Sequence, residues 1–415
     1  DLMGKRIAAL VLAACMALPL FGCGSKLTAQ SLTEGMTART IDTHIDLTDD
    51  STAVMDFAAA LLRQTTQEEG VLLSPVSLLY ALGMTANGAS GTTLSQLEKA
   101  MGMDRDTLND YLYTYRMSLP ENTKKCKLSL ANSLWVRDIF RLEDSFLDNC
   151  VSYYDAEVYR SAFDETMKND LNHWVSDQTD GMIDKLLEQA PGARTMLYLV
   201  NAVCFDAKWQ EPYEKSQIQE GAAFTAIDGT RQTADLLWSQ ESLYLSDDNT
   251  TGFMKYYDGG RYAFVGLLPN EGVSIADYVA GLTGGKLHAL LNAPQHGTVE
   301  AAIPRFKASS SLELSDALKA MGVTDAFDST AADLRAMGGA PNDQLYVGAV
   351  LHKTYLELDE NGTKAAAVTA VDMVAASPEP PEVHRVVLDH PFVYMIVDTH
   401  ANLPLFLGTV TQMDG

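Results

Sequence analysis

The sequence predicts an α+β fold in which helices pack on large, mainly antiparallel sheets. Segments with helical periodicity gather between residues 54 and 102, and apolar segments with the length of strands follow along the rest of the chain. From residue 51 onward there is no linker rich in Pro, Gly or Ser and no internal repeat. Early helices and late strands without a boundary between them predict one mixed domain over residues 51–415.

Three helices are expected first. Residues 54–65 place apolar side chains on one face of a helix. Ser74 and Pro75 then open a second helix, with Ser at the N-cap and Pro at the first helical position. The run Thr-Leu-Ser-Gln at 93–96 has the spacing of a capping box, which predicts a third helix that ends at Gly102.

Seven later segments have the length and apolar density of strands. Two of them, 128–136 and 196–205, are long enough and apolar enough to be buried in the middle of a sheet. The other five are 255–257, 262–268, 299–306, 345–359 and 392–397. Strand order does not follow from these patterns.

Composition excludes several classes of protein. The chain of 415 residues is 47% hydrophobic and 20% charged, which is typical of a globular protein with a sizeable core. Its net charge of −25 repels phosphate backbones and anionic headgroups, so we expect no nucleic-acid partner. Five Cys in a chain of this length exclude a disulfide framework, and we expect Cys126, Cys150 and Cys204 to be ordinary thiols.

The N-terminal residues have the pattern of a secretory signal. Lys5 and Arg6 precede an apolar run over 7–20. The following Leu-Phe-Gly-Cys resembles a bacterial lipobox, which implies cleavage after residue 22 and a lipid on Cys23; the alternative is a plain signal peptide. We therefore expect a signal peptide over 1–22, a flexible tether over 23–50, and a protein attached to the outer cell surface by lipid alone, or extracellular if shed.

Sequence motifs of enzymes are missing. The chain contains no HExxH, CxxC or GxSxG, and the Gly284-Gly285-Lys286 run lacks the Ser or Thr of a phosphate-binding loop. A lipid-anchored hydrolase is therefore the weakest hypothesis.

Blocks along the chain resemble the serpin family of protease inhibitors. The most extensive is VLLSPVSLLYALGMTANGASGTT, starting at Val71. It is followed in family order by ANSLW at 131–135, LNHWV at 171–175, LVNA at 199–202 with Trp209, His352-Lys353, ENGT at 360–363, DHPF at 389–392 and FLGTV at 406–410. The resemblance covers about residues 51–415.

The resemblance implies helices packed on three largely antiparallel sheets, with an exposed reactive-centre loop. In serpins a serine protease cleaves this loop and is acylated by it. The loop then inserts into the central sheet, called sheet A, and carries the protease with it. The family mechanism needs no cofactor and no metal, and we expect a monomer.

The loop of this chain has the pattern of a strand that can be buried. Successive side chains of a strand point to opposite faces. One face, Thr363 to Ala375 at every second position, carries no charge, whereas Lys364 and Asp372 lie on the other. An inserted charge would cost several kcal/mol, roughly, so this pattern favours an inhibitor. We predict as hinge residues Glu360, Gly362, Thr363, Lys364, Ala365, Ala366, Ala367, Val368 and Thr369.

Family spacing places the scissile bond at Ala376-Ser377, seventeen residues in from Glu360. Ala376 suits the small specificity pockets of elastase-like or some subtilisin-like serine proteases. A bond shifted by one or two residues, to 375–376 or 374–375, predicts the same target class. Met373 is the alternative if the target prefers a larger side chain.

Two further groups of residues match positions that control insertion. Ser74, Ser77, Asn201 and His352 match the family's shutter, the polar cluster beneath the point where sheet A opens. Trp209, Arg305 and Glu360 match the breach, where insertion begins. Ser74 as a helix N-cap is the simpler interpretation of that residue, and both roles are compatible.

The sequence therefore predicts an irreversible inhibitor of elastase-like serine proteases that forms a covalent acyl complex. The alternative is a serpin that does not inhibit, either a binding protein or a plain protease substrate. A charged or Pro-containing hinge would favour that alternative, and the inward positions of this hinge have neither.

Overall fold

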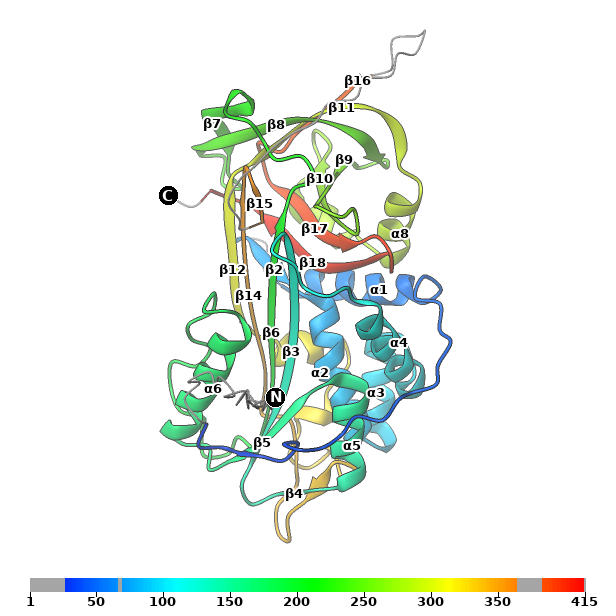
Figure 1. Cartoon of the computed structure of the whole chain (residues 1–415), viewed down its shortest axis with the longest axis vertical. Coiled ribbons are helices and arrows are strands. Elements are labelled where there is room, and N and C mark those ends of the chain that lie inside the picture. Colours follow the sequence, from blue (N-terminus) through cyan, green and yellow to red (C-terminus); the bar gives the residue numbers. More distant parts are fainter. Residues whose placement is uncertain (1–26, 66–68, 364–382, 414–415) are drawn as a thin grey trace, which may run out of the picture.

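The computed structural model describes residues 27–65, 69–363 and 383–413 (Figure 1). The helices are α1 (Ser51–Arg63), α2 (Pro75–Gly88), α3 (Gly91–Met101), α4 (Arg105–Ser118), α5 (Asp144–Tyr154), α6 (Glu165–Gln178), α7 (Ile275–Ala280), α8 (Gly284–Asn292) and α9 (Ser315–Ala320). None of the helices in these ranges is long and apolar enough to cross a lipid bilayer.

The strands form two large sheets and one small sheet. They are β1 (Gln30–Ser31), β2 (Val71–Leu73), β3 (Cys126–Arg137), β4 (Arg141–Leu142), β5 (Glu157–Ser161), β6 (Leu197–Lys208), β7 (Ile218–Thr225), β8 (Arg231–Ser246), β9 (Thr250–Tyr256), β10 (Tyr262–Pro269), β11 (Gln295–Pro304), β12 (Phe306–Glu313), β13 (Gly338–Gly339), β14 (Ala349–Asp359), β15 (Gly362–Thr363), β16 (Val383–Val387), β17 (Phe392–Asp398) and β18 (Leu403–Val410).

The seven-stranded sheet has the order β1-β5-β3-β6-β15-β14-β12. The nine-stranded sheet runs β16-β11-β8-β9-β10-β17-β18-β2, with β7 on β8, and β4 pairs with β13. Most of these pairs are antiparallel; β3–β5, β6–β14 and β11–β16 are parallel. The predicted α+β class is confirmed.

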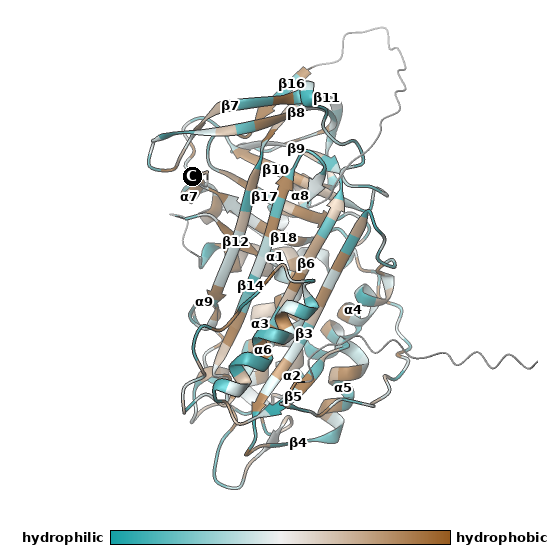
Figure 2. Ribbon diagram, turned by 60° about the vertical axis from the view of Figure 1, so that its left-hand side comes forward, coloured by the Kyte–Doolittle hydropathy of each residue, from teal (hydrophilic) through white to brown (hydrophobic). Residues whose placement is uncertain are grey.

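The seven-stranded sheet is covered on both faces because its central strands are apolar on both. Leu134 and Leu199 belong to the main core, which includes the fully buried helix α2. Trp135 and Val200, one residue further along each strand, pack instead with Leu171 of α6. Figures 1 and 2 show α6 lying across one face of the sheet, with α2 on the other. Insertion of another strand into this sheet would therefore take place between two packed layers.

The long predicted strands and the first two predicted helices are confirmed within a few residues. The third helix begins earlier than predicted, because Ser90 rather than Thr93 is its N-cap residue. The Thr93 hydroxyl instead accepts a bond from the Asp333 amide at 3.0 Å, and Gln96 Oε1 accepts from the Asp325 amide at 2.9 Å. The capping-box interpretation of 93–96 is therefore wrong: these polar side chains bind a distant loop.

Residues 27–50, within the predicted flexible tether, instead lie along the folded body. β1 pairs with β5, and the Leu32 amide donates to the Val158 carbonyl at 2.8 Å. The carboxylate of Asp170 on α6 accepts bonds from the Thr28 hydroxyl at 2.6 Å and the Ala29 amide at 2.7 Å. Backbone pairing and one buried carboxylate thus hold a segment whose own side chains are mostly polar.

Candidate functional site

The site is a seam in the seven-stranded sheet between β6 and β14. In their N-terminal halves, which are the lower halves in Figure 1, these strands pair directly and in parallel, residues 198–203 with 349–354. Further up they part, and β15 lies between them, pairing through Gly362 with Lys208 of β6 and with Asp359 of β14. The described chain of the hinge therefore already occupies the upper end of this seam.

Gly362 allows this close approach. Its φ is +150°, and a Cβ atom there would lie 2.1 Å from the Ala207 carbonyl oxygen. Any other residue at this position would push β15 away from β6. Gly362 is thus required for the hinge to lie this close to β6.

Thr363 is the last described residue of the hinge and is fully buried. Its hydroxyl is 2.8 Å from the Tyr257 hydroxyl, and the Tyr257 ring stacks on Trp209 with centroids 4.4 Å apart. Burial raises the pKa of Tyr257 above its ordinary value, so the phenol stays protonated and available for this bond. Tyr257 thus binds Thr363, the first inward residue of the hinge, and Trp209 stacks on the Tyr257 ring.

The three predicted breach residues lie together around the base of β15. Arg305 donates to Glu360 at 2.8 Å and to Asp235 at 2.9 Å, with about a third of each side chain exposed. Trp209 Nε1 donates to the Asp359 carbonyl, and the Trp209 amide donates to the Asn361 carbonyl, both at 2.9 Å. These contacts fix the turn between β14 and β15, from which the loop departs.

The Asp359 carboxylate closes the same turn. It accepts from the amides of Asn361 at 2.7 Å and Gly362 at 3.2 Å. Burial, with a smaller effect of the neighbouring Glu360 charge, raises the pKa of Asp359 above its ordinary value.

The four predicted shutter residues are buried where β6 and β14 still pair. Asn201 lies opposite His352 in the β6–β14 register, and Asn201 Nδ2 donates to Asn132 of β3 at 2.7 Å. His352 Nε2 accepts from the Ser74 amide at the start of α2, at 3.0 Å. Asn132, Asn201 and His352 therefore form a polar row across β3, β6 and β14, next to the N-terminus of α2.

Within the described chain, several buried polar groups of the shutter have neither a charged partner nor a hydrogen-bond partner. Burial lowers the pKa of His352 to about 3, so the imidazole is neutral at physiological pH. Ser74 makes no side-chain cap to α2, although it holds the N-cap position predicted for it. Among the described residues, four buried polar atoms of this cluster lack a hydrogen-bond partner: Ser74 Oγ, Ser77 Oγ, Asn201 Oδ1 and His352 Nδ1. Such groups are costly in a closed sheet.

The other predicted site residues lie outside the described residues. They are the lipid-attachment residue Cys23, the hinge residues Lys364, Ala365, Ala366, Ala367, Val368 and Thr369, and the reactive bond Ala376-Ser377. In the ranges that the structure covers, no group of three or more His, Cys, Asp or Glu could hold a metal ion.

Sequence reasoning missed several residues of the site, among them Asn132, Tyr257, Asp235 and Asp359. Asn132 could have been found from the sequence, because it is a polar residue inside an apolar strand segment. Tyr257 and Asp235 could not, because their roles depend on the approach of β15 and of Arg305, which are distant in sequence.

Comparison with known proteins agrees with this geometry. A family model described as "Serpin (serine protease inhibitor)" matches residues 52–413. Among curated proteins, neuroserpin of Gallus gallus is 28% identical over 365 residues, covering 84% of this chain and 87% of its own. Serpin B9 of Homo sapiens is 30% identical over 381 residues, covering 86% and 98%.

Among solved structures, the thermophilic serpin tengpin in its native state is 39% identical with a TM-score of 0.87, covering 93% of this chain and 100% of its own. Tengpin in its latent state gives a lower TM-score, 0.77, at 37% identity, covering 91% and 100%. The family match spans nearly the whole described chain, so this protein belongs to the serpin family.

Proposed function

We propose that this serpin is an irreversible, suicide-type inhibitor of elastase-like serine endopeptidases. The observation that carries the proposal is the position of β15. Thr363, the first residue of the uncharged face, is buried between β6 and β14 at the upper end of a seam that remains closed below it. The sequence then continues the same uncharged parity through Ala365, Ala367 and Thr369.

The proposed reaction begins as ordinary proteolysis. The serine hydroxyl of the protease attacks the carbonyl carbon of Ala376, an ester forms, and the peptide bond breaks, with a proton passing to the departing amine of Ser377. The cleaved loop then extends β15 downward between β6 and β14. A strand of seventeen residues spans roughly 56 Å, at about 3.3 Å a residue, so the acylated protease would be carried a comparable distance.

Opening the seam would separate the shutter residues of β6 from those of β14. The direct pairing of β6 with β14 is replaced by pairing of each strand with the inserted loop. The orphaned polar atoms of Asn201 and His352 make the closed arrangement less favourable than a fully bonded one. The backbone pairing of β6 with β14 at these residues opposes opening, which fits a barrier that delays insertion until cleavage.

The test is to mix the full chain with an elastase and to follow the products by denaturing gel and mass spectrometry. A covalent complex, with release of the 39-residue fragment from Ser377 to Gly415, would support both the mechanism and the bond. Cleavage without a complex would favour the alternative, a non-inhibitory serpin that acts as a substrate or a binding protein. A complex with trypsin instead of elastase would contradict the target class and leave the mechanism standing.

We also infer that the protein is exported and attached to the outer cell surface through a lipid on Cys23. The charged pair Lys5-Arg6, the apolar run and the lipobox-like Leu-Phe-Gly-Cys support this location. Labelling of cells with a fatty-acid analogue should mark the unaltered chain and not Cys23→Ser. Equal labelling would contradict the inference.

A further inference from the structure

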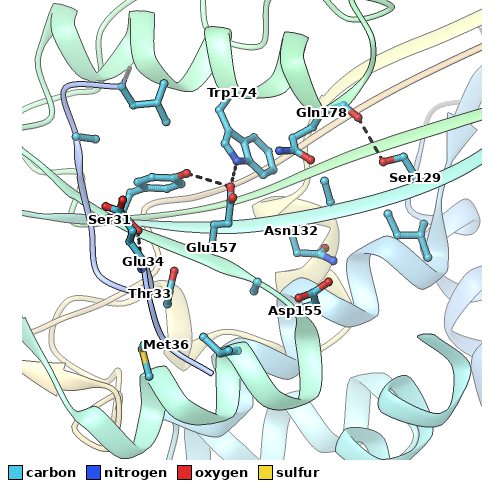
Figure 3. Close-up of a pocket in the computed structure, with 17 residues that line it drawn as sticks. Ser31, Thr33, Glu34, Met36, Ser129, Asn132, Asp155, Glu157, Trp174 and Gln178 are labelled. Carbon is cyan, nitrogen blue, oxygen red and sulfur yellow. Dashed lines mark hydrogen bonds between the residues drawn. The ribbon is translucent and has the colours of Figure 1, made fainter. Parts of the chain in front are cut away.

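A cavity of about 720 Å³ lies at the edge of the seven-stranded sheet, away from the seam. Its walls are the N-terminal segment, strands β3 and β5, and helices α5 and α6 (Figure 3). The cavity occupies the space beside β3 that β5 would fill if β5 began several residues earlier in the chain. β5 starts at Glu157, opposite Ser133, so the edge of β3 over 129–132 has no neighbouring strand in the described part of the chain.

The open edge presents backbone groups of β3 to the cavity. The inner edge of β3 pairs with β6 over 126–136. At the outer edge, the Leu128 amide donates to the Asn122 side chain at 2.9 Å, and pairing with β5 begins only at Ser133. Unpaired strand edges are ready positions for an added strand.

The cavity is acidic. Three of its lining residues are carboxylates, Glu34, Asp155 and Glu157, and its seventeen lining residues, all described, include no Lys, Arg or His. Arg116, which does not line the cavity, lies 3.9 Å from Asp155 Oδ2 and forms a weak pair with this carboxylate. Glu157 Oε2 accepts bonds from Trp174 Nε1 and, at 3.0 Å, from the Tyr159 hydroxyl. These bonds orient a negative charge beside two aromatic rings, an environment that favours an organic cation. The carboxylates do not form a metal-binding group in the described chain.

Asn132 gives an independent indication of a ligand. It lines the cavity and is only 3% exposed. Its Oδ1 accepts the bond from Asn201, whereas its Nδ2 donates to none of the described residues. The Asn132 Nδ2 atom is not among the fully enclosed unpaired atoms, so it can donate to a carbonyl group of a ligand bound beside the open strand edge.

Two of the carboxylates, Glu157 and Asp155, lie on opposite faces of the sheet edge. Glu157 lies beside Trp174 of α6 (Figure 3), and Asp155 directly follows the C-terminus of α5. Successive side chains of an added strand point to opposite faces, so two consecutive basic residues would reach one carboxylate each. From this arrangement we propose that the cavity binds a short, extended dibasic peptide that pairs with the edge of β3. This site is independent of the reactive loop.

The experiment titrates the full chain with the peptide acetyl-Ala-Arg-Arg-amide by calorimetry and by Trp fluorescence. Two peptide controls separate the two contributions. Citrulline in place of both Arg keeps the shape and removes the charge, and N-methylation of the backbone amides keeps the charge and removes strand pairing. We expect both controls to bind at least about tenfold more weakly, since each removes a charge-assisted contact or a hydrogen bond.

The matched protein variants are Glu157→Gln and Glu271→Gln. The amide oxygen introduced by Glu157→Gln can still accept the bonds from Trp174 and Tyr159, so the fold is kept and only the charge is lost; thermal unfolding checks this. Glu271 is exposed in a loop outside the cavity. We expect about tenfold weaker binding for Glu157→Gln and no change for Glu271→Gln. Equal affinity for both variants, or for the N-methylated peptide, would mean diffuse attraction to the acidic surface and would overturn the proposal.

Discussion

At the scale of single residues, the entrance to the seam depends on a few side chains that meet from distant parts of the chain. Thr363 brings a hydroxyl into a fully buried position, where a polar group without a partner is unfavourable. Tyr257 supplies that partner and is itself held by its stack on Trp209. The pair allows a hinge residue to be buried before any cleavage.

The Tyr257–Thr363 bond can be tested with a double-mutant cycle. Tyr257→Phe leaves the Thr363 hydroxyl buried without a partner, so the free energy of unfolding should fall by about 1–2 kcal/mol. Adding Thr363→Val replaces the remaining polar group with an apolar one of similar size and should recover much of this loss. Urea unfolding of the two single variants and the double variant measures the coupling. Strictly additive effects would contradict a bond that positions the hinge.

At the scale of elements, β14 is attached along its lower half and separated from β6 along its upper half. The lower attachment includes His352, which accepts from the Ser74 amide of the α2 N-terminus and lies opposite Asn201. Its neutral state is therefore part of what keeps the seam closed. Protonation would place an uncompensated charge between the sheet and the helix.

This attachment predicts a pH dependence. The pKa of His352 is lowered to about 3 in the folded protein, against 6.5 for the ordinary side chain. Between these values the unfolded chain binds a proton that the folded chain does not, so His352 lowers stability as pH falls below about 6.5. The contribution to the slope is roughly 1 kcal/mol per pH unit.

Urea unfolding between pH 7.5 and pH 4.5 measures this slope. His352→Gln should have a shallower dependence than the unaltered chain, and His296→Gln, a change at an exposed histidine of β11, should not. An unchanged slope in His352→Gln would show that other groups cause the loss of stability in acid.

How far the elements could be predicted depends on where their stabilisation comes from. β3 and β6 bury both faces, so their apolar runs identify them in the sequence. The positions of Ser74, Asn201 and His352 came from the family resemblance, and periodicity alone does not reveal them. The contacts of residues 27–50 with the folded body could not be predicted, because they are made by backbone pairing with β5 and by the distant Asp170.

At the scale of the whole molecule, two large sheets and their helices surround the seam, where β6 and β14 pair directly over 198–203 and 349–354 and are separated by β15 beyond that. In our account the loop enters this seam with the side of Thr363 facing inward. A charge at an inward position should therefore stop insertion, and the same charge at an outward position should not.

The measurement that tests this account most directly compares two hinge variants, Ala367→Arg and Ala366→Arg, in the number of inhibitor molecules consumed per elastase molecule inactivated. Residue 367 shares the parity of the buried Thr363, and residue 366 does not. Burying an unpaired Arg costs several kcal/mol, roughly, so Ala367→Arg should be cleaved as a substrate, with little complex. Ala366→Arg should inhibit nearly as well as the unaltered chain. Equal inhibition by both variants, or loss in Ala366→Arg alone, would contradict insertion of this face into the seam between β6 and β14.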